Sequence, residues 1–162
     1  MGEVLANAIA IGIGATAFMD LAALVRRHVF GTPSVDYALV GRWLAYMPRG
    51  RFIHCPISTS PSVRGEGAIG WIAHYVIGIV FAGVLLVVVG EGWARHPTIL
   101  PALAVGIGSV AAPFLLMQPG MGLGIAARRM PHPGAARLRS LITHLLFGIG
   151  LYGASVTMSL WR

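Results

Sequence analysis

The amino-acid sequence predicts an all-α, polytopic membrane protein, a bundle of four transmembrane helices. Three observations predict this class: 56% of the residues are hydrophobic, only 10% are charged, and the apolar residues gather in four long runs. A soluble domain carries about 25% charged residues, so too few charges remain here to cover a surface that faces water. Lipid is therefore the expected solvent for most of this chain.

The four apolar runs occupy residues 4–25, 67–90, 98–127 and 141–160. Each reaches the length of about 20 residues that a helix needs to cross a bilayer. Inside hydrocarbon every backbone polar group must be bonded within its own segment, which favours a helix for all four runs. We therefore expect a single integral membrane domain over residues 1–162, with linkers at residues 26–66 and 128–140.

The twelve arginines are distributed unevenly among the linkers. Six lie in residues 26–66 and four in residues 128–140, whereas residues 91–97 carry one. Loops rich in arginine remain in the cytoplasm, so both long linkers are expected there and both termini on the opposite side. The same distribution accounts for the net charge of +7 and argues against a nucleic-acid-binding protein.

The first linker contains an apolar and aromatic segment at residues 35–47, with Ser34 as its expected N-cap. The segment is too short to span a bilayer, and its aromatic residues and arginine suit an interfacial helix on the cytoplasmic face.

The third apolar run is interrupted by Pro113 and Pro119, and glycines follow at positions 120, 122 and 124. Proline removes a backbone hydrogen bond and kinks a helix. One interpretation is an ordinary kink. The other is a break that faces a ligand, as in transporters.

Two pairs of matching motifs suggest that the chain consists of two tandem helical hairpins. The pattern Ile-x-His-x-x-x-Gly-Ile occurs at residues 72–79 and again at 142–149. The pattern Ala-x-Gly-Ile-Gly occurs at residues 10–14 and again at 104–108. Such a repeat would relate the hairpins by an axis along the membrane normal.

One polar side chain in each apolar run lies at a similar depth. At a rise of about 1.5 Å per residue, all four fall in the half of the bilayer nearest the arginine-rich linkers. Asp20, His74 and His144 each share a helix face with small residues four positions away. Such faces let membrane helices pack closely. We therefore expect a buried polar cluster at this level. Its expected members are Asp20, His74, Gln118, His144, Thr16 and Thr143, and its cytoplasmic rim is Arg26, Arg27 and Glu66.

Three interpretations of this cluster stay open. In the first, Asp20 bonds an imidazole and the network fixes the register of the helices. In the second, the acid and the imidazoles relay a proton or a cation for transport, because histidine titrates near neutral pH. In the third, His74 and His144 ligate a haem or, together with Asp20, a transition metal. No other cofactor is predicted.

The sequence contains no P-loop, no paired zinc-ligand motif, no dinucleotide fingerprint and no evident pair of nucleophile and base. We therefore expect a non-enzymatic membrane protein that binds a partner or a ligand, either as a homo-oligomer or as an accessory subunit of a larger membrane complex. The alternatives are a small proton- or cation-coupled transporter and a haem- or metal-binding membrane protein.

Several short motifs are spread along nearly the whole chain. They are Gly-Ala-Thr-Ala-Phe-Met-Asp at residues 14–20, Gly-Arg-Trp at 41–43, Pro-Arg-Gly-Arg-Phe at 48–52, His54, Gly-Trp-Ile-Ala-His-Tyr at 70–75, Pro-Thr at 97–98, Pro-Ala at 101–102, Gln-Pro at 118–119 and Arg-Ser-Leu-Ile-Thr-His at 139–144. Together they resemble an uncharacterised bacterial family of small four-helix membrane proteins, domain of unknown function 2938. The resemblance implies four spans and a location in the bacterial inner membrane, where the arginine-rich linkers would place both termini in the periplasm. It implies no activity and no site residues.

Overall fold

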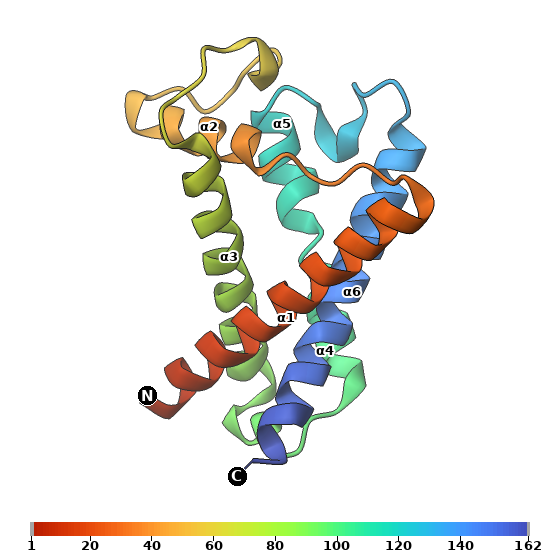
Figure 1. Cartoon of the computed structure of the whole chain (residues 1–162). Helices are drawn as coiled ribbons and strands as arrows, with labels where there is room; N and C mark the ends of the chain where they lie inside the picture. The colour runs from red at the N-terminus through yellow and green to blue at the C-terminus, as the bar shows by residue number, and fades with distance from the viewer. Residues whose placement is uncertain (1, 162) are drawn as a thin grey trace. The chain divides into compact units, whose positions relative to one another are not determined.

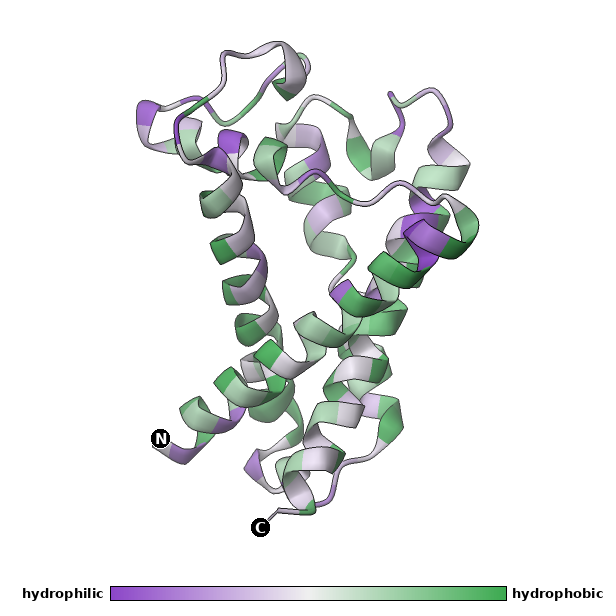
Figure 2. Cartoon of the chain, in the orientation of Figure 1, coloured by the Kyte–Doolittle hydropathy of each residue, from purple (hydrophilic) through white to green (hydrophobic). Residues whose placement is uncertain are grey.

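The computed structural model describes residues 2–161, and its regular elements are helices (Figure 1). Within these residues four helices are long and apolar enough to cross a membrane. They are α1 (Gly2–Phe30), α3 (Glu66–Val89), the interrupted span Ile99–Gly120 and α6 (Pro133–Ser159). The predicted all-α fold with four membrane helices is therefore confirmed. Figure 2 shows hydrophilic residues in the first linker and at the C-terminal end of α1, and mostly apolar residues along α3 and α4 (Ile99–Gly108).

Several predicted helix ends were wrong, for identifiable reasons. α1 continues to Phe30 instead of ending at residue 25, since no helix breaker precedes Gly31, whose φ of +62° ends the helix. The third span ends at Gly120 instead of residue 127, since Gly122 and Gly124 adopt positive φ. α6 begins at Pro133, eight residues before the predicted start at 141, because proline is well suited to the first position of a helix.

The chain divides into two compact units. Within the described residues, unit 1 contains the segment up to Ser34, the segment Tyr75–Ser109 and the segment from Ile142 onward. Unit 2 contains Val35–His74 and Val110–Leu141. The expectation of a single membrane domain stays a prediction.

Two close helix crossings in unit 1 each join consecutive membrane helices. At the first, Gly12 of α1 lies against α3, where a Cβ on residue 12 would be 2.8 Å from the Ile79 nitrogen. At the second, Gly106 of α4 lies against α6, where a Cβ would be 2.6 Å from the Gly148 nitrogen. Only a residue without a side chain permits such approaches between membrane helices. The buried residues of unit 1 include Ala8, Ile11, Ala15, Ala82, Leu85, Leu86, Ala102, Phe147 and Leu151.

The two crossings use equivalent positions of the matching motifs. Gly12 and Gly106 are the first glycines of the two Ala-x-Gly-Ile-Gly motifs. Their partners Gly78 and Gly148 are the glycines of the two Ile-x-His-x-x-x-Gly-Ile motifs, and a Cβ on Gly12 would lie 3.0 Å from the Gly78 carbonyl carbon. The motif glycines therefore meet within each hairpin, which is the contact pattern that two tandem hairpins predict.

Unit 2 holds α2 (Tyr37–Tyr46) against the first turns of α3. A Cβ on Gly41 would overlap the Glu66 carbonyl oxygen, and a Cβ on Gly70 would overlap the Tyr37 carbonyl oxygen. The expected N-cap Ser34 was wrong, because the Asp36 side chain accepts the Ala38 N–H at 2.9 Å and caps the helix.

The third span is broken where it passes from unit 1 to unit 2. Its first part, α4, ends before a turn at Ser109 and Val110. Its second part consists of the π-helical segment η4 (Pro113–Met117) and one turn of α5 (Gln118–Gly120). Proline at position 113 cannot donate a backbone hydrogen bond, which favours such irregular helix. Met121, which directly follows α5, forms a small core of unit 2 together with Tyr46 and Ile57.

Candidate functional site

Asp20 in α1 accepts a hydrogen bond from the hydroxyl of Tyr75 in α3, with 3.2 Å between Tyr75 Oη and Asp20 Oδ2. Both residues belong to unit 1 and both are half-buried. One turn earlier in α1, Thr16 is fully buried and donates its hydroxyl to the Gly12 carbonyl at 2.7 Å. The glycine crossing between α1 and α3 brings these polar groups together, since the Thr16 hydroxyl lies directly against Gly78.

His144 in α6 is hydrogen-bonded to Ser109 at the end of α4, with 2.7 Å between His144 Nδ1 and Ser109 Oγ. Ser109 is buried and also donates its hydroxyl to the Gly106 carbonyl at 2.5 Å. A hydroxyl has one hydrogen, so His144 Nδ1 must be the donor in the first bond. This arrangement depends on the crossing of Gly106 with Gly148.

Arg26 in α1 reaches Thr143 in α6, with 3.5 Å between Arg26 Nη2 and Thr143 Oγ1. Its Nε and Nη1 are buried and have no hydrogen-bond partner among the described residues. Arg27, the next residue, is exposed. The expected rim residue Arg26 is thus tied to the expected cluster residue Thr143, and both belong to unit 1.

In unit 2, His74 lies in a group of aromatic side chains. Its Nε2 is 3.1 Å from the hydroxyl of Tyr37 in α2. The Tyr37 ring is also centred 4.4 Å from the His74 ring and 4.5 Å from the Trp71 ring. The close approach of Gly70 to the Tyr37 backbone positions this group.

Glu66, the remaining rim residue, begins α3 and binds Arg42 of α2 with both carboxylate oxygens, at 2.7 and 2.8 Å. It also accepts the Val63 N–H at 2.8 Å. The hydrogen bond to Glu66 raises the pKa of the Arg42 guanidinium above its usual value. Glu66 therefore holds α2 to α3 through a bidentate ion pair.

Gln118 is buried in α5, and its Oε1 has no hydrogen-bond partner among residues 2–161. A loop of the first linker covers this turn, because His54 N–H donates to the Gly120 carbonyl and Ile57 N–H donates to the Met121 carbonyl, both at 2.9 Å. His54 is buried as well: its Nδ1 lies 3.0 Å from Ser60 Oγ, whereas its Nε2 has no partner within the described part of the chain.

The six expected cluster residues are thus divided between the units. Unit 1 contains four of them and brings each to a named neighbour, while His74 and Gln118 belong to unit 2. Their convergence into one cluster stays a prediction. The residues divide as Thr16, Asp20, Thr143 and His144 in unit 1, and His74 and Gln118 in unit 2.

The sequence interpretation missed the hydroxyl partners and the residues of the first linker. Ser109 was detectable, because it is the only hydroxyl-bearing residue between Ile99 and Gly120. Tyr75 was detectable as well, because it follows His74 directly in the motif Gly-Trp-Ile-Ala-His-Tyr. Nothing in the pattern of the first linker marked Tyr37, Arg42 or His54 as neighbours of a membrane helix.

Among residues 2–161, no group of three or more His, Cys, Asp and Glu side chains is placed to hold a metal ion. The haem or metal alternative on His74, His144 and Asp20 therefore rests on the sequence pattern alone.

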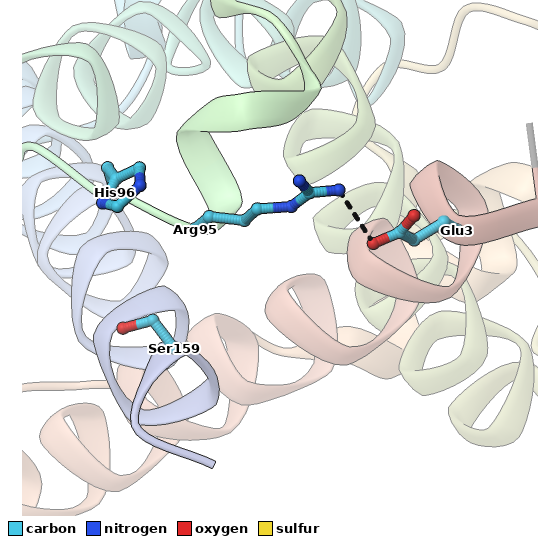
Figure 3. A pocket seen from close by; sticks show the side chains of 4 residues that line it. All are labelled: Glu3, Arg95, His96 and Ser159. Atoms are coloured by element: carbon cyan, nitrogen blue, oxygen red, sulfur yellow. Dashed lines mark ion pairs between the residues drawn. The ribbon is translucent and has the colours of Figure 1, made fainter. Parts of the chain in front are cut away.

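An open hollow of about 320 Å³ lies in unit 1, lined by Glu3, Arg95, His96 and Ser159 (Figure 3). Glu3 and Arg95 form an ion pair across it at 3.5 Å, with both side chains more than half exposed. An exposed ion pair contributes about 0–1 kcal/mol, so the hollow is weakly organised. None of its residues was expected in a site.

Comparison with known proteins identifies a family for this chain. The model of a family described as "Protein of unknown function (DUF2938)" matches residues 9–158. No curated protein and no solved structure is significantly similar to the chain.

Proposed function

We propose that this chain, which belongs to the DUF2938 family of proteins of unknown function, is a non-enzymatic membrane protein that binds a small polar ligand in unit 2, at the end of its broken third span. We place it in the bacterial inner membrane, with both termini in the periplasm and the two arginine-rich linkers in the cytoplasm.

One observation carries the proposal: two buried polar atoms, which have no hydrogen-bond partner among the described residues, lie on two segments that backbone bonds join. Gln118 Oε1 belongs to α5, and His54 Nε2 belongs to the loop that docks on α5 through the Gly120 carbonyl. A buried polar group without a partner costs about 1–3 kcal/mol, so native structures seldom keep two together. A bound ligand would supply the missing partner to both.

The chemistry of the two atoms defines the class of ligand. We take His54 Nδ1 as the donor to Ser60 Oγ, which leaves a lone pair at His54 Nε2, and Gln118 presents a carbonyl oxygen. Both are acceptors, so the ligand must donate hydrogen bonds.

The surrounding charges narrow this class further. The guanidinium groups of Arg49 and Arg51 lie 5.4 and 5.2 Å from the Tyr46 ring centre, and the Tyr46 ring lies 5.2 Å from the His54 ring. Two positive charges close to the site disfavour a cation. The ligand is therefore a neutral molecule that carries hydroxyl or amide N–H groups, and it enters when the loop at residues 52–57 lifts from α5.

The test is thermal unfolding of the purified protein in an amine-oxide detergent, which has no hydroxyl or amide groups. Glycerol and acetamide at low millimolar concentration are the neutral donor probes, and methylammonium is the cationic comparison. We expect a neutral probe to raise the unfolding midpoint of the wild type and of the control Met117→Leu, but not of Gln118→Leu. If no neutral probe acts and Gln118→Leu simply stabilises the protein, the atoms surround structural water and the proposal is wrong.

A second candidate function, proton-coupled transport, is favoured by the hydroxyl partners. Each of three ionisable side chains in the spans is bonded to a hydroxyl: Asp20 to Tyr75, His74 to Tyr37, and His144 to Ser109. A hydroxyl both donates and accepts, as a proton relay requires.

Proteoliposomes under an imposed pH gradient test this second candidate. We expect Asp20→Asn and Tyr75→Phe to abolish any proton flux and Thr157→Ala to leave it unchanged. A wild type as proton-tight as empty vesicles would exclude the relay.

A further inference from the structure

Arg26 carries a permanent charge for which the described chain provides almost no acceptor. Its Nη2 reaches Thr143 Oγ1 at 3.5 Å, a long bond to a neutral hydroxyl. Its Nε and Nη1 are closed to solvent and have no hydrogen-bond partner among residues 2–161. A guanidinium presents five N–H donors in a fixed plane, so most of its donors are unsatisfied here.

This arrangement is unfavourable unless an acceptor comes from outside the chain. A buried unpaired donor costs about 1–3 kcal/mol, and more when the group is charged. Arginine cannot reduce this cost by losing its proton, because a guanidinium stays protonated in any protein environment. An oxyanion with several acceptor oxygens would satisfy it, and guanidinium groups match phosphate in geometry.

The position of Arg26 in α1 indicates where such a phosphate would come from. It follows directly on the apolar run of residues 4–25, in the last part of the membrane-spanning helix α1, where the headgroups of a bilayer begin. Arg27 and His28 next to it are exposed and add positive charge or donors at the same level. Headgroup phosphates are the most abundant anions at this depth.

We propose that Arg26, together with Thr143 and Arg27, binds the phosphate of a phospholipid headgroup. Arg26 supplies the charged donors, and Thr143 orients the guanidinium through Nη2. The site lies within unit 1 and does not depend on the ligand proposed for unit 2.

Native mass spectrometry in a maltoside detergent tests this proposal. Phosphatidylglycerol is the phosphate-bearing probe, and a glucosyl diacylglycerol is the phosphate-free lipid of similar tail. We expect the wild type to retain phosphatidylglycerol in preference to the glucolipid. Arg26→Gln is expected to bind phosphatidylglycerol about tenfold more weakly, which corresponds to about 1.4 kcal/mol.

Arg95→Gln is the matched control, because Arg95 is also an arginine of unit 1 but is exposed and paired with Glu3. It should bind phosphatidylglycerol as the wild type does. Arg26→Lys keeps the charge without the planar fork and should retain intermediate affinity, which also covers the case in which Arg26→Gln does not fold. Equal retention of both lipids by the wild type, or undiminished binding by Arg26→Gln, would overturn the proposal. Protection from thermal unfolding by inorganic phosphate alone would overturn the lipid as the source.

Discussion

Gly106 of α4 and Gly148 of α6 meet backbone to backbone, so that a Cβ on Gly148 would lie 2.9 Å from the Ala102 carbonyl oxygen and 3.4 Å from the Gly106 Cα. The hydrogen bond between His144 and Ser109 lies one helical turn away from this crossing. Both glycines are therefore needed for α4 and α6 to come close enough for the hydrogen bond between His144 and Ser109 to form.

We predict that Gly106→Ala destabilises the protein, because the added methyl group would meet the Gly148 backbone and could not be relieved by rotating a side chain. Overpacking of this kind costs about 1–3 kcal/mol. Gly108→Ala is the control, since Gly108 lies two residues further on with nothing within 4 Å of the added atom. Thermal unfolding in detergent measures both variants. Equal midpoints for the two would show that the helices do not cross at Gly106.

The ion pair between Arg42 and Glu66 leads to a second prediction. Arg42→Met should loosen α2 from α3, because Glu66 loses two charge-assisted hydrogen bonds. The expected result is faster proteolytic cleavage in residues 50–64 than in the wild type.

A double variant provides the control for this pair. Glu66→Met should have a similar effect, and Arg42→Met combined with Glu66→Met should add little to either single change, as expected for residues that act as one pair. Additive effects in the double variant would contradict the assignment.

The four spans could be predicted from the sequence because hydropathy over about 20 residues records whether a segment can lie in lipid. The polar residues could be found for a related reason. Asp20 and His144 are rare ionisable groups in apolar runs, where such groups are costly. Local composition contains both kinds of information.

Apart from Ser109, the only hydroxyl-bearing residue of its span, the partners of the polar residues could not be predicted, because they depend on contacts between distant segments. Tyr37 reaches His74 only because Gly41 and Gly70 let α2 lie on α3. The sequence of α2, ten residues with aromatic side chains and an arginine, is equally typical of a helix that lies on the membrane surface. The buried state of His54 depends in the same way on its backbone bond to Gly120.

The placement of the arginines predicts the topology. Reporter fusions after Arg95 and after Arg129 should give opposite results, because one membrane span separates the two positions. Arg95 lies between α3 and α4, whereas Arg129 lies between the third span and α6. We expect a fluorescent protein to be active after Arg129 and alkaline phosphatase to be active after Arg95, since arginine-rich loops remain in the cytoplasm. The reverse pattern would place the termini in the cytoplasm.

Ser155 offers a prediction of the opposite sign. It is fully buried in α6, and its hydroxyl has no hydrogen-bond partner within the described residues. Removing an unsatisfied buried hydroxyl recovers its desolvation penalty, so Ser155→Ala should stabilise the protein by about 1 kcal/mol. Ser109→Ala is the matched comparison, because that buried hydroxyl bonds both Gly106 and His144 and its loss should destabilise. Denaturant titration in detergent would show the two midpoints moving in opposite directions, and a loss of stability in Ser155→Ala would mean that Ser155 bonds a group outside the described chain.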